Sequence, residues 1–304
     1  MTRPIGLPFL GSKKRVQKDI FTLYQYLNPD WRTTPFIDLF AGGGAIGLYF
    51  ATKGVQDITM NCYPEKYANA LKTILFEDID ITTLICTREE FFAIDKNSTN
   101  GIDVLKRVCN SFGNDEKAYL YSKENSELKY NLAIEIIKNH PDTWGQYKQT
   151  QTYKDALKAS TPEQQLKQLE RIEQLVQLQQ LERIQQLERI EQLERIEQLE
   201  QVKRFNYKDN INIISRDYKE VPIRKDAFYY LDPPYFDCYT GGYTPIYFAE
   251  FTAYVKDNNI KGILSHYEDD RLTEHFGEFQ PLGHGSNFKT KKEKKVEGFY
   301  LINI

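Results

Sequence analysis

The chain has 304 residues, of which 40% are apolar and 27% are charged, so it can bury the core of a large domain and is not disordered throughout. Its formal net charge of -3 gives it no overall attraction for nucleic acid, so a polyanion site would have to come from local clusters of Lys and Arg. No window approaches about eighteen consecutive apolar residues, and the first residues lack the apolar core of a secretory signal. We therefore expect a soluble, cytoplasmic protein with no membrane partner.

The four cysteines and four histidines show no spacing typical of a metal site or of a disulfide framework. The cysteines lie far apart, without a C-x-x-C pair, and we expect them to be reduced thiols. We also expect no bound metal, and structural rather than catalytic roles for the histidines.

The first part of the chain alternates helical and strand patterns. Apolar residues recur at helical spacing over 13–26, and a short apolar run at 35–40 leads directly through a glycine turn into a helical pattern at 45–50. A second strand at 57–61 and a helix over 64–76 follow. Such alternation predicts βαβ units and an α/β domain with a mainly parallel sheet.

The same alternation resumes near the carboxyl terminus. The apolar runs at 211–215, 227–231 and 262–265 predict strands, and 248–255 has a helical pattern. Residues 298–304 predict a closing strand. These segments complete the sheet that the first part of the chain begins.

Residues 87–205 differ in composition from both flanks, and we expect an insertion there. It divides a catalytic domain into a first part, residues 1–86, and a second part, residues 206–304. The insertion holds the one clear sequence repeat, over 163–204, in which the unit LERIEQ or LERIQQ recurs. Within it an apolar residue stands at every third position.

The composition of this leucine repeat predicts an α-helix, because neither Gly nor Pro interrupts it. A three-residue period drifts around a helix by about 60° per step, so its apolar stripe cannot stay in register as a heptad coiled coil. The alternatives are several short helices, or one helix buried by several surfaces. A β-solenoid also uses hexapeptides, but the turn formers and small residues of its corners are missing. The repeat therefore suggests a spacer or a self-association element.

A glycine turn follows the first predicted strand. The apolar run contains one acid, Asp38, and the segment from Gly42 to Gly44 then opens the next helix, where backbone can approach a ligand closely. Turns of this kind also occur in α/β proteins that bind no ligand there. A second motif is needed to favour a binding role.

That second motif is Asp232-Pro233-Pro234-Tyr235, at the end of an apolar strand. An exocyclic amine is a poor nucleophile, because its lone pair is delocalised, and hydrogen-bond acceptors help to restore that lone pair. Asp232 can accept one amine hydrogen, and proline leaves carbonyl oxygens outside the sheet ladder, with Pro233 as the candidate second acceptor. The Tyr235 ring can stack on a base that has been flipped out of a duplex. The motif thus suits methylation of an aromatic amine.

Together these segments resemble the Dam-type (D12-class) adenine-specific DNA methyltransferases, over residues 8–77 and 206–304. The start, PFLGSK, is similar to the family's P-x-x-G-G/S-K segment, and the glycine turn is similar to its D-x-F-x-G-x-G motif. The resemblance implies a Rossmann-like S-adenosylmethionine-dependent methyltransferase fold. The cofactor-binding positions that it implies are Phe9, Lys13, Asp38, Phe40, Gly42, Gly44, Cys62, Asp217 and Asp232.

The chain departs from the family at one of these positions. Relatives carry an acid at the end of the second strand that binds the ribose hydroxyls, whereas Cys62 stands there in this sequence. Loss of a carboxylate hydrogen bond costs about 1.5–3 kcal/mol, so we expect weaker cofactor binding unless Asn61 or Glu65 substitutes.

The resemblance implies transfer of a methyl group from S-adenosylmethionine to the 6-amino group of adenine in DNA, by base flipping and direct in-line transfer. The catalytic residues are then Asp232 to Tyr235, and the insertion is the target-recognition region. The expected DNA-binding residues are Lys14, Arg15, Lys117, Tyr119, Lys289, Lys291 and Lys292. Two alternatives remain, a catalytically weakened DNA-binding relative and an interaction protein dominated by the repeat; RNA is the alternative substrate, and restriction–modification the expected context.

Overall fold

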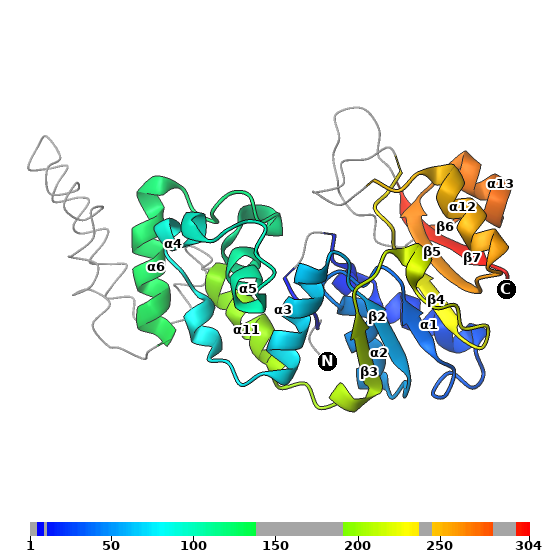
Figure 1. Cartoon of the computed structure of the whole chain (residues 1–304), viewed down its shortest axis with the longest axis horizontal. Coiled ribbons are helices and arrows are strands. Elements are labelled where there is room, and N and C mark those ends of the chain that lie inside the picture. The colour runs from blue at the N-terminus through cyan, green and yellow to red at the C-terminus, as the bar shows by residue number, and fades with distance from the viewer. Residues whose placement is uncertain (1–4, 9–10, 138–190, 237–244, 282–295) are drawn as a thin grey trace, which may run out of the picture. The chain divides into compact units, whose positions relative to one another are not determined.

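A computed structural model describes residues 5–8, 11–137, 191–236, 245–281 and 296–304, drawn in colour in Figure 1. The chain forms two compact units. Unit 1 comprises Met1–Glu77, Thr99–Gly101 and Gln201–Ile304, and unit 2 comprises Asp78–Ser98 and Ile102–Glu200. The sequence analysis expects an insertion over 87–205. Unit 2 begins nine residues before that expected start, at Asp78, and ends at Glu200.

Unit 1 is built on a seven-stranded sheet of order β3-β2-β1-β4-β5-β7-β6. Its strands are β1 (Phe36–Asp38), β2 (Ile58–Asn61), β3 (Ile211–Ile214), β4 (Phe228–Leu231), β5 (Gly262–Tyr267), β6 (Gln280–Pro281) and β7 (Glu297–Ile302). Strands β1 to β5 are parallel, and β7 runs antiparallel to both of its neighbours. The predicted α/β class with a mainly parallel sheet is confirmed, in the 3-2-1-4-5 order of doubly wound folds.

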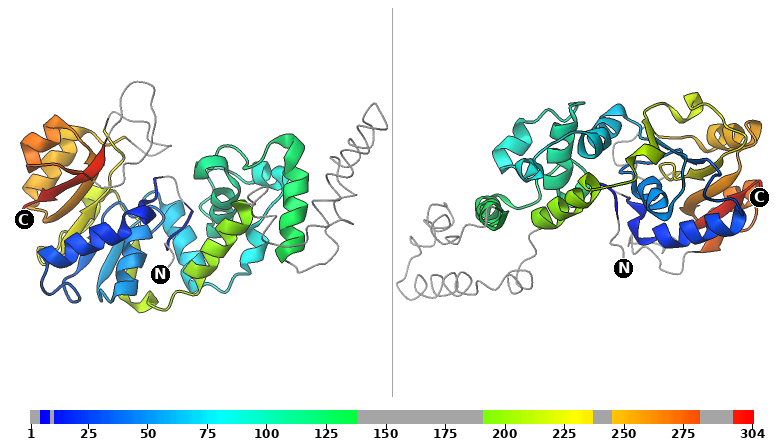
Figure 2. Two further views of the ribbon diagram at one scale, coloured as in Figure 1. Left: turned by 180° about the vertical axis from the view of Figure 1, so that it is seen from behind. Right: turned by 90° about the horizontal axis from the view of Figure 1, so that it is seen from below.

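The helices of unit 1 follow the strands, and all but the last, α13, fall on helical patterns that the sequence predicts (Figure 2). They are α1 (Gln17–Leu27), α2 (Ala45–Lys53), α3 (Glu65–Phe76), α12 (Phe248–Asp257) and α13 (Asp270–Phe276). The single helix expected over 13–26 is instead a short 3₁₀ helix, η1 (Lys13–Arg15), followed by α1, because the backbone of Val16 leaves the helical region. No helix within the described ranges combines the length and the apolar character needed to cross a membrane.

Both faces of the sheet are buried, as expected for a sheet covered by helices on each side. On one face the ring of Phe36 lies 5.4 Å from Tyr24 of α1 and 4.2 Å from Phe50 of α2. On the other face the next residue along β1, Ile37, belongs to a cluster that includes Phe251 of α12 and Leu272 of α13. The period of two along β1 therefore divides the core into two layers.

The described part of unit 2 is helical. It contains η2 (Ile81–Leu84), α4 (Arg88–Ala93), α5 (Gly101–Asn110), η3 (Phe112–Asn114) and α6 (Lys123–Ile137), with α11 (Glu191–Lys203) extending from it into unit 1. Helix α4 begins with a capping box, in which Thr87 and Glu90 satisfy each other's backbone N–H groups. Helix α11 carries the end of the leucine repeat, and Ile196 and Leu199, three residues apart, are both buried. Repeat residues 163–190 lie outside the described residues.

Candidate active site

Three acids meet at one edge of the unit 1 sheet. Asp38 is the last residue of β1, Asp232 follows the end of β4, and these strands are parallel neighbours. Glu297 begins the antiparallel β7 and pairs with Tyr267, the last residue of β5, so it lies at the same edge. The edge between β1 and β4 is where the strand order reverses, the usual ligand position in open α/β sheets.

The ammonium group of Lys13 is the centre of the polar contacts at this edge. Its Nζ lies 2.8 Å from Asp232 Oδ2 and 3.4 Å from Glu297 Oε1, and it donates a 3.2 Å hydrogen bond to the Gly11 carbonyl. It also lies over the Tyr235 ring, 5.2 Å from the centroid. The amino-terminal segment and the D-P-P-Y motif, far apart in sequence, are therefore joined through one cation.

Burial and charge compete at this ion pair. The Lys13 and Asp232 side chains are only 12% and 16% exposed. Burial raises the pKa of Asp232, and Lys13 opposes that rise through its charge and its hydrogen bond. Burial alone would lower the pKa of Lys13, but Asp232 and Glu297 raise it overall, so the lysine stays charged. Lys13 therefore favours the ionised form of a carboxylate that burial would otherwise neutralise.

Two acceptor atoms at this edge are buried without a hydrogen bond inside the described part of the chain, Asp38 Oδ1 and Asp232 Oδ1. Buried polar atoms normally have a partner, so such atoms point to a ligand. Burial, with the nearby charge of Asp232, raises the pKa of Asp38 to about 8, although the backbone N–H groups of Gly47 and Phe40 oppose the rise. In the free protein Asp38 is therefore mostly protonated at neutral pH.

The glycine turn after β1 has the backbone geometry that its sequence predicts. Gly42 and Gly44 have φ values of 49° and 74°, where residues with a Cβ are strained, and Gly44 forms the amino-terminal cap of α2. The amino-terminal segment lies on this turn, because the Leu7 N–H donates to the Gly43 carbonyl at 2.9 Å. Gln17 strengthens the join by donating to the carbonyls of both Ile5 and Ala45.

Cys62 is a poor match for the ribose-binding acid that the family resemblance implies, because a buried neutral thiol is a weak hydrogen-bond acceptor. Burial raises the pKa of its thiol, and the nearby Asp38 adds to the rise. Asn61 is also committed, because it donates to the carbonyls of Leu39 and Arg216 and accepts from the Arg216 N–H. Glu65, exposed in the first turn of α3, is the acid available at this end of β2.

The D-P-P-Y segment contacts residues of β5 and β7. The Tyr235 hydroxyl donates to Glu297 at 2.7 Å, and its ring lies 4.7 Å from the rings of His266 and Tyr267. His266 Nε2 accepts a 3.1 Å hydrogen bond from the Phe236 N–H. His266 thus orients the chain next to Tyr235, a structural role of the kind the sequence predicted for the histidines.

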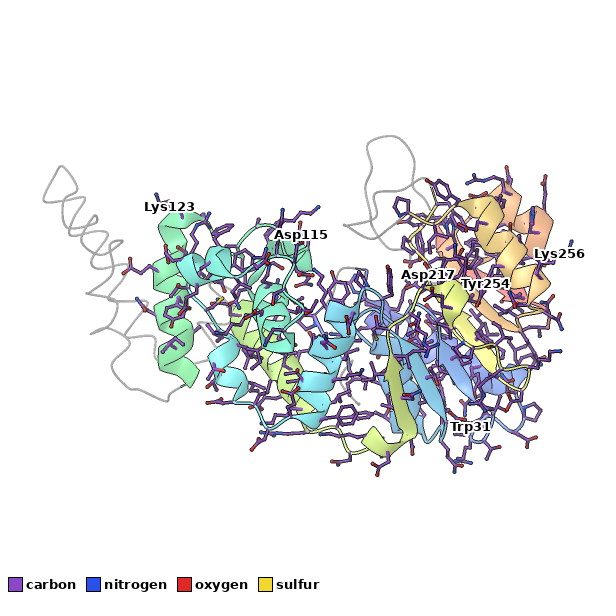
Figure 3. The ribbon with its side chains drawn as sticks, viewed as in Figure 1. Trp31, Asp115, Lys123, Asp217, Tyr254 and Lys256 are labelled. Carbon is purple, nitrogen blue, oxygen red and sulfur yellow. The ribbon has the colours of Figure 1, made fainter. Side chains whose placement is uncertain are left out.

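The remaining positions at which the sequence analysis expects cofactor binding are distributed as follows. Phe40 packs against Tyr218, with ring centroids 5.6 Å apart. Asp217 accepts from the Lys219 N–H at 3.0 Å and so caps η5 (Tyr218–Glu220), near Tyr254 of α12 (Figure 3). Phe9 lies outside the described residues.

The expected DNA-binding residues fall into three groups. Arg15 and Lys117 are exposed and Lys14 is half-buried. Tyr119, in contrast, is buried, and its hydroxyl donates to the Cys86 carbonyl at 2.9 Å, which corrects its assignment to a direct DNA contact. Lys289, Lys291 and Lys292 lie outside the described residues.

One residue with functional geometry was not singled out by the sequence analysis. Glu297 contacts both Lys13 and Tyr235, and its only sequence signal is an acid directly before an apolar closing strand. Its position depends on neighbours that are distant in sequence. Phe112, in the turn-rich segment 110–114 of the expected recognition region, has 67% of its surface exposed, on a turn where Gly113 has a φ of 64°.

The chemistry of the site rests on the residues described above. Neither a protein-family model nor a curated protein matches the chain. The described geometry supplies a glycine turn, two buried acceptors and an aromatic ring, arranged around one lysine.

Proposed function

We propose that this chain is an S-adenosylmethionine-dependent methyltransferase that acts on the 6-amino group of adenine in DNA. The observation that carries the proposal is the Lys13–Asp232 ion pair of 2.8 Å, which joins the amino-terminal segment to the D-P-P-Y motif. The glycine turn and Asp38 lie at the same sheet edge. Three segments that the family resemblance links by sequence are thus neighbours in space.

The sheet supports this assignment at the level of the fold. Its order is that of a doubly wound sheet with one change, the antiparallel β7 between β5 and β6. The order is compatible with the Rossmann-like fold that the family resemblance implies. A fold alone does not fix an activity, so the residues at the edge carry the rest of the argument.

The cofactor side of the proposed site consists of the glycine turn, Asp38 and Glu65. S-adenosylmethionine supplies an electrophilic methyl group on a sulfonium, and it also carries an ammonium group and ribose hydroxyls. The buried acceptor Asp38 Oδ1 fits a cationic or hydrogen-bond-donating group, and the exposed Glu65 fits a hydroxyl. A cation beside Asp38 favours loss of its proton, since opposite charge lowers a carboxyl pKa.

The amine side of the proposed site consists of Asp232, Pro233 and Tyr235. Asp232 Oδ1 is a buried acceptor without a partner in the described residues, suited to one hydrogen of an exocyclic amine. Lys13 favours the ionised form of that carboxylate against the effect of burial, and an ionised acceptor makes the stronger hydrogen bond. The Pro233 carbonyl is the second acceptor, and the Tyr235 ring is the stacking surface for a flipped base.

The helical insertion is the proposed target-recognition region. The exposed Lys117 suits a phosphate contact, and the exposed ring of Phe112 is available for contact with a base. A second candidate function, a DNA-binding relative with weakened catalysis, is favoured by one observation. The acid expected at the end of β2 is replaced by the fully buried Cys62.

Methyl transfer is the direct test. Purified protein is incubated with duplex DNA and S-adenosylmethionine labelled in the methyl group, and the digested nucleosides are separated. We expect label in N6-methyladenine with the parent chain and none with Asp232→Ala. Label found only in cytosine or in protein would refute the proposal, and DNA binding without any methyl transfer would favour the second candidate.

A further inference from the structure

Helix α11 is fixed in unit 2 by two polar side chains of the leucine repeat. Gln192 donates to Asn110 Oδ1 at 2.6 Å and to the Tyr119 hydroxyl at 3.2 Å. Arg195 donates through one nitrogen to the carbonyls of Val108, Cys109 and Ser111, at 3.3, 2.8 and 2.7 Å. Both side chains are buried, so α11 is held by specific hydrogen bonds as well as by apolar contact.

The receptor for these two side chains is the carboxyl-terminal end of α5. The last carbonyls of a helix have no partner within the helix and carry its negative dipole end, which a guanidinium satisfies well. Asn110 completes the receptor, because its Nδ2 donates to the carbonyls of Leu84 and Lys106 and so aims its oxygen at Gln192. This receptor, the α5 end, recognises a Gln and an Arg three residues apart on one helix.

The matching pattern occurs more than once in the chain. In α11 it reads Gln-x-x-Arg-Ile-x-x-Leu, with Ile196 and Leu199 as its buried apolar members. The same pattern begins at three upstream positions, Gln168, Gln180 and Gln186. The chain therefore carries four copies of the sequence that the α5 end binds, of which the α11 copy is in place.

We infer that the α5 end binds the repeat in more than one register, and that the copy beginning at Gln186 can replace the copy beginning at Gln192. A shift by one hexapeptide presents Arg189, Ile190 and Leu193 where Arg195, Ile196 and Leu199 stood, so the polar and apolar contacts are remade. The six residues released would lengthen the connection to β3. Longer connections cost little, about 0.6 kcal/mol for each doubling of a flexible loop.

This exchange gives the repeat a role that does not depend on the proposed methyltransferase activity. A helix that can dock by any of several identical copies tolerates the gain or loss of whole hexapeptides, because each change restores the docking sequence. It also accounts for the repetition within the unit, in which Gln and Arg recur together with the apolar positions. A spacer would need the helical composition but not this pairing.

Three variants of the full chain test the inference. Arg195→Ala removes the arginine of the copy in α11. The triple variant Arg171→Ala, Arg183→Ala, Arg189→Ala removes the arginine of each upstream copy. The quadruple variant removes the arginine of all four copies. Amide hydrogen exchange of α5 reports docking in each. We expect changes of about twofold or less in the first two and a loss of protection of about tenfold or more in the quadruple variant, because only there does no copy remain.

A second readout locates the docked copy. In Arg195→Ala, protection should move from residues 198–203 toward residues 186–193. Substituting the neighbouring Glu170, Glu182 and Glu188 with Ala in the Arg195→Ala background is the matched control, and it should add nothing. Unfolding of unit 2 by Arg195→Ala alone, or additive effects in the quadruple variant, would overturn the inference. So would protection in Arg195→Ala that falls on dilution, since the occupant would then come from a second chain.

Discussion

Lys13 Nζ lies 2.8 Å from Asp232 Oδ2, so the charge of a lysine near the amino terminus opposes the burial that raises the pKa of the D-P-P-Y acid. Removing the lysine leaves a buried carboxylate with less opposing charge. In Lys13→Met we therefore expect the pKa of Asp232 to rise further. If the ionised carboxylate is needed for methyl transfer, the acid limb of the pH–rate profile moves to higher pH, and activity lost at neutral pH is partly recovered in alkaline buffer.

Rates of methyl transfer measured from pH 6 to 10 would check this prediction. The exposed Lys256 of α12 offers the control, and Lys256→Met should keep the parental profile. An unchanged acid limb in Lys13→Met would show that Lys13 does not affect the pKa of Asp232.

Asp232 itself is expected to act in the chemical step. Asp232→Ala should lower the single-turnover rate by a hundredfold to a thousandfold, about 3–4 kcal/mol, because an acceptor that polarises the amine in the transition state is lost. Asp232→Asn should retain more activity, since an amide oxygen still accepts a hydrogen bond without the charge. DNA affinity should change little in either variant. Asp209→Ala, at an exposed acid, is the control, and a near-parental rate for Asp232→Ala would remove this residue from the mechanism.

Asp38 predicts a pH dependence of stability in the ligand-free protein. Its pKa is about 8 in the folded state, against 3.8 as the ordinary value. A group whose pKa is raised by folding stabilises the fold fully below its unfolded pKa, and that contribution is lost as pH rises through the folded value. The free energy of unfolding should therefore fall between pH 5 and pH 9 more steeply in the parent than in Asp38→Asn.

Urea unfolding at a series of pH values gives both curves. Two curves of equal slope would show that Asp38 does not hold its proton in the folded state. Adding S-adenosylmethionine should flatten the parental curve, because a cationic ligand at this carboxylate binds the ionised form.

The strands and the two motifs could be predicted because their signals are local. The apolar runs of β1 and β4 each end at an acid, and a glycine turn or a proline pair follows at once. Parallel strands bring such ends to one sheet edge, so the meeting of Asp38 and Asp232 followed from the fold class. The two-residue β6 escaped prediction because it has no pattern of its own and depends on pairing with β7.

The contacts that the sequence did not predict are those set by packing between distant segments. Glu297 reaches Lys13 because β7 pairs with β5 in antiparallel register, a relationship with no local signature. Tyr119 lies in a polar, turn-rich stretch and was expected at the surface. Its ring instead packs with Cys86 and Phe91 in a small core of unit 2.

Cys62→Asp tests how the end of β2 takes part in cofactor binding. An acid at this position would match the one that the family resemblance implies, but a carboxylate at this fully buried position lacks water and a compensating charge. We expect the substitution to destabilise the fold on the order of 3 kcal/mol without tightening cofactor binding. Thermal unfolding and calorimetric titration with S-adenosylmethionine measure the two effects.

Glu65→Gln is the complementary variant, because Glu65 is the exposed acid at the same end of β2. It should leave stability unchanged and weaken cofactor binding about tenfold, through loss of a charged hydrogen bond to a hydroxyl. If Cys62→Asp bound the cofactor more tightly and Glu65→Gln had no effect, position 62 and not Glu65 would be the position that faces the ribose.

The Tyr235 hydroxyl and Glu297 should act as one unit, because the hydroxyl donates to Glu297 Oε1 at 2.7 Å. Tyr235→Phe keeps the stacking ring and removes the donor, and we expect a loss in kcat on the order of tenfold with little change in KM for DNA. Glu297→Gln should cost more, because Glu297 also contacts Lys13. The double variant should be about as slow as Glu297→Gln, because the hydrogen bond that Tyr235→Phe removes is already weakened in Glu297→Gln. Tyr235→Ala provides the contrast, because losing the ring should weaken DNA binding by about 1–3 kcal/mol. The exposed Glu278, changed to Gln, is the matched control for charge and should behave as the parent. Rates that multiply independently in the double variant would show that Tyr235 and Glu297 contribute separately, and the positioning role of Glu297 would then be wrong.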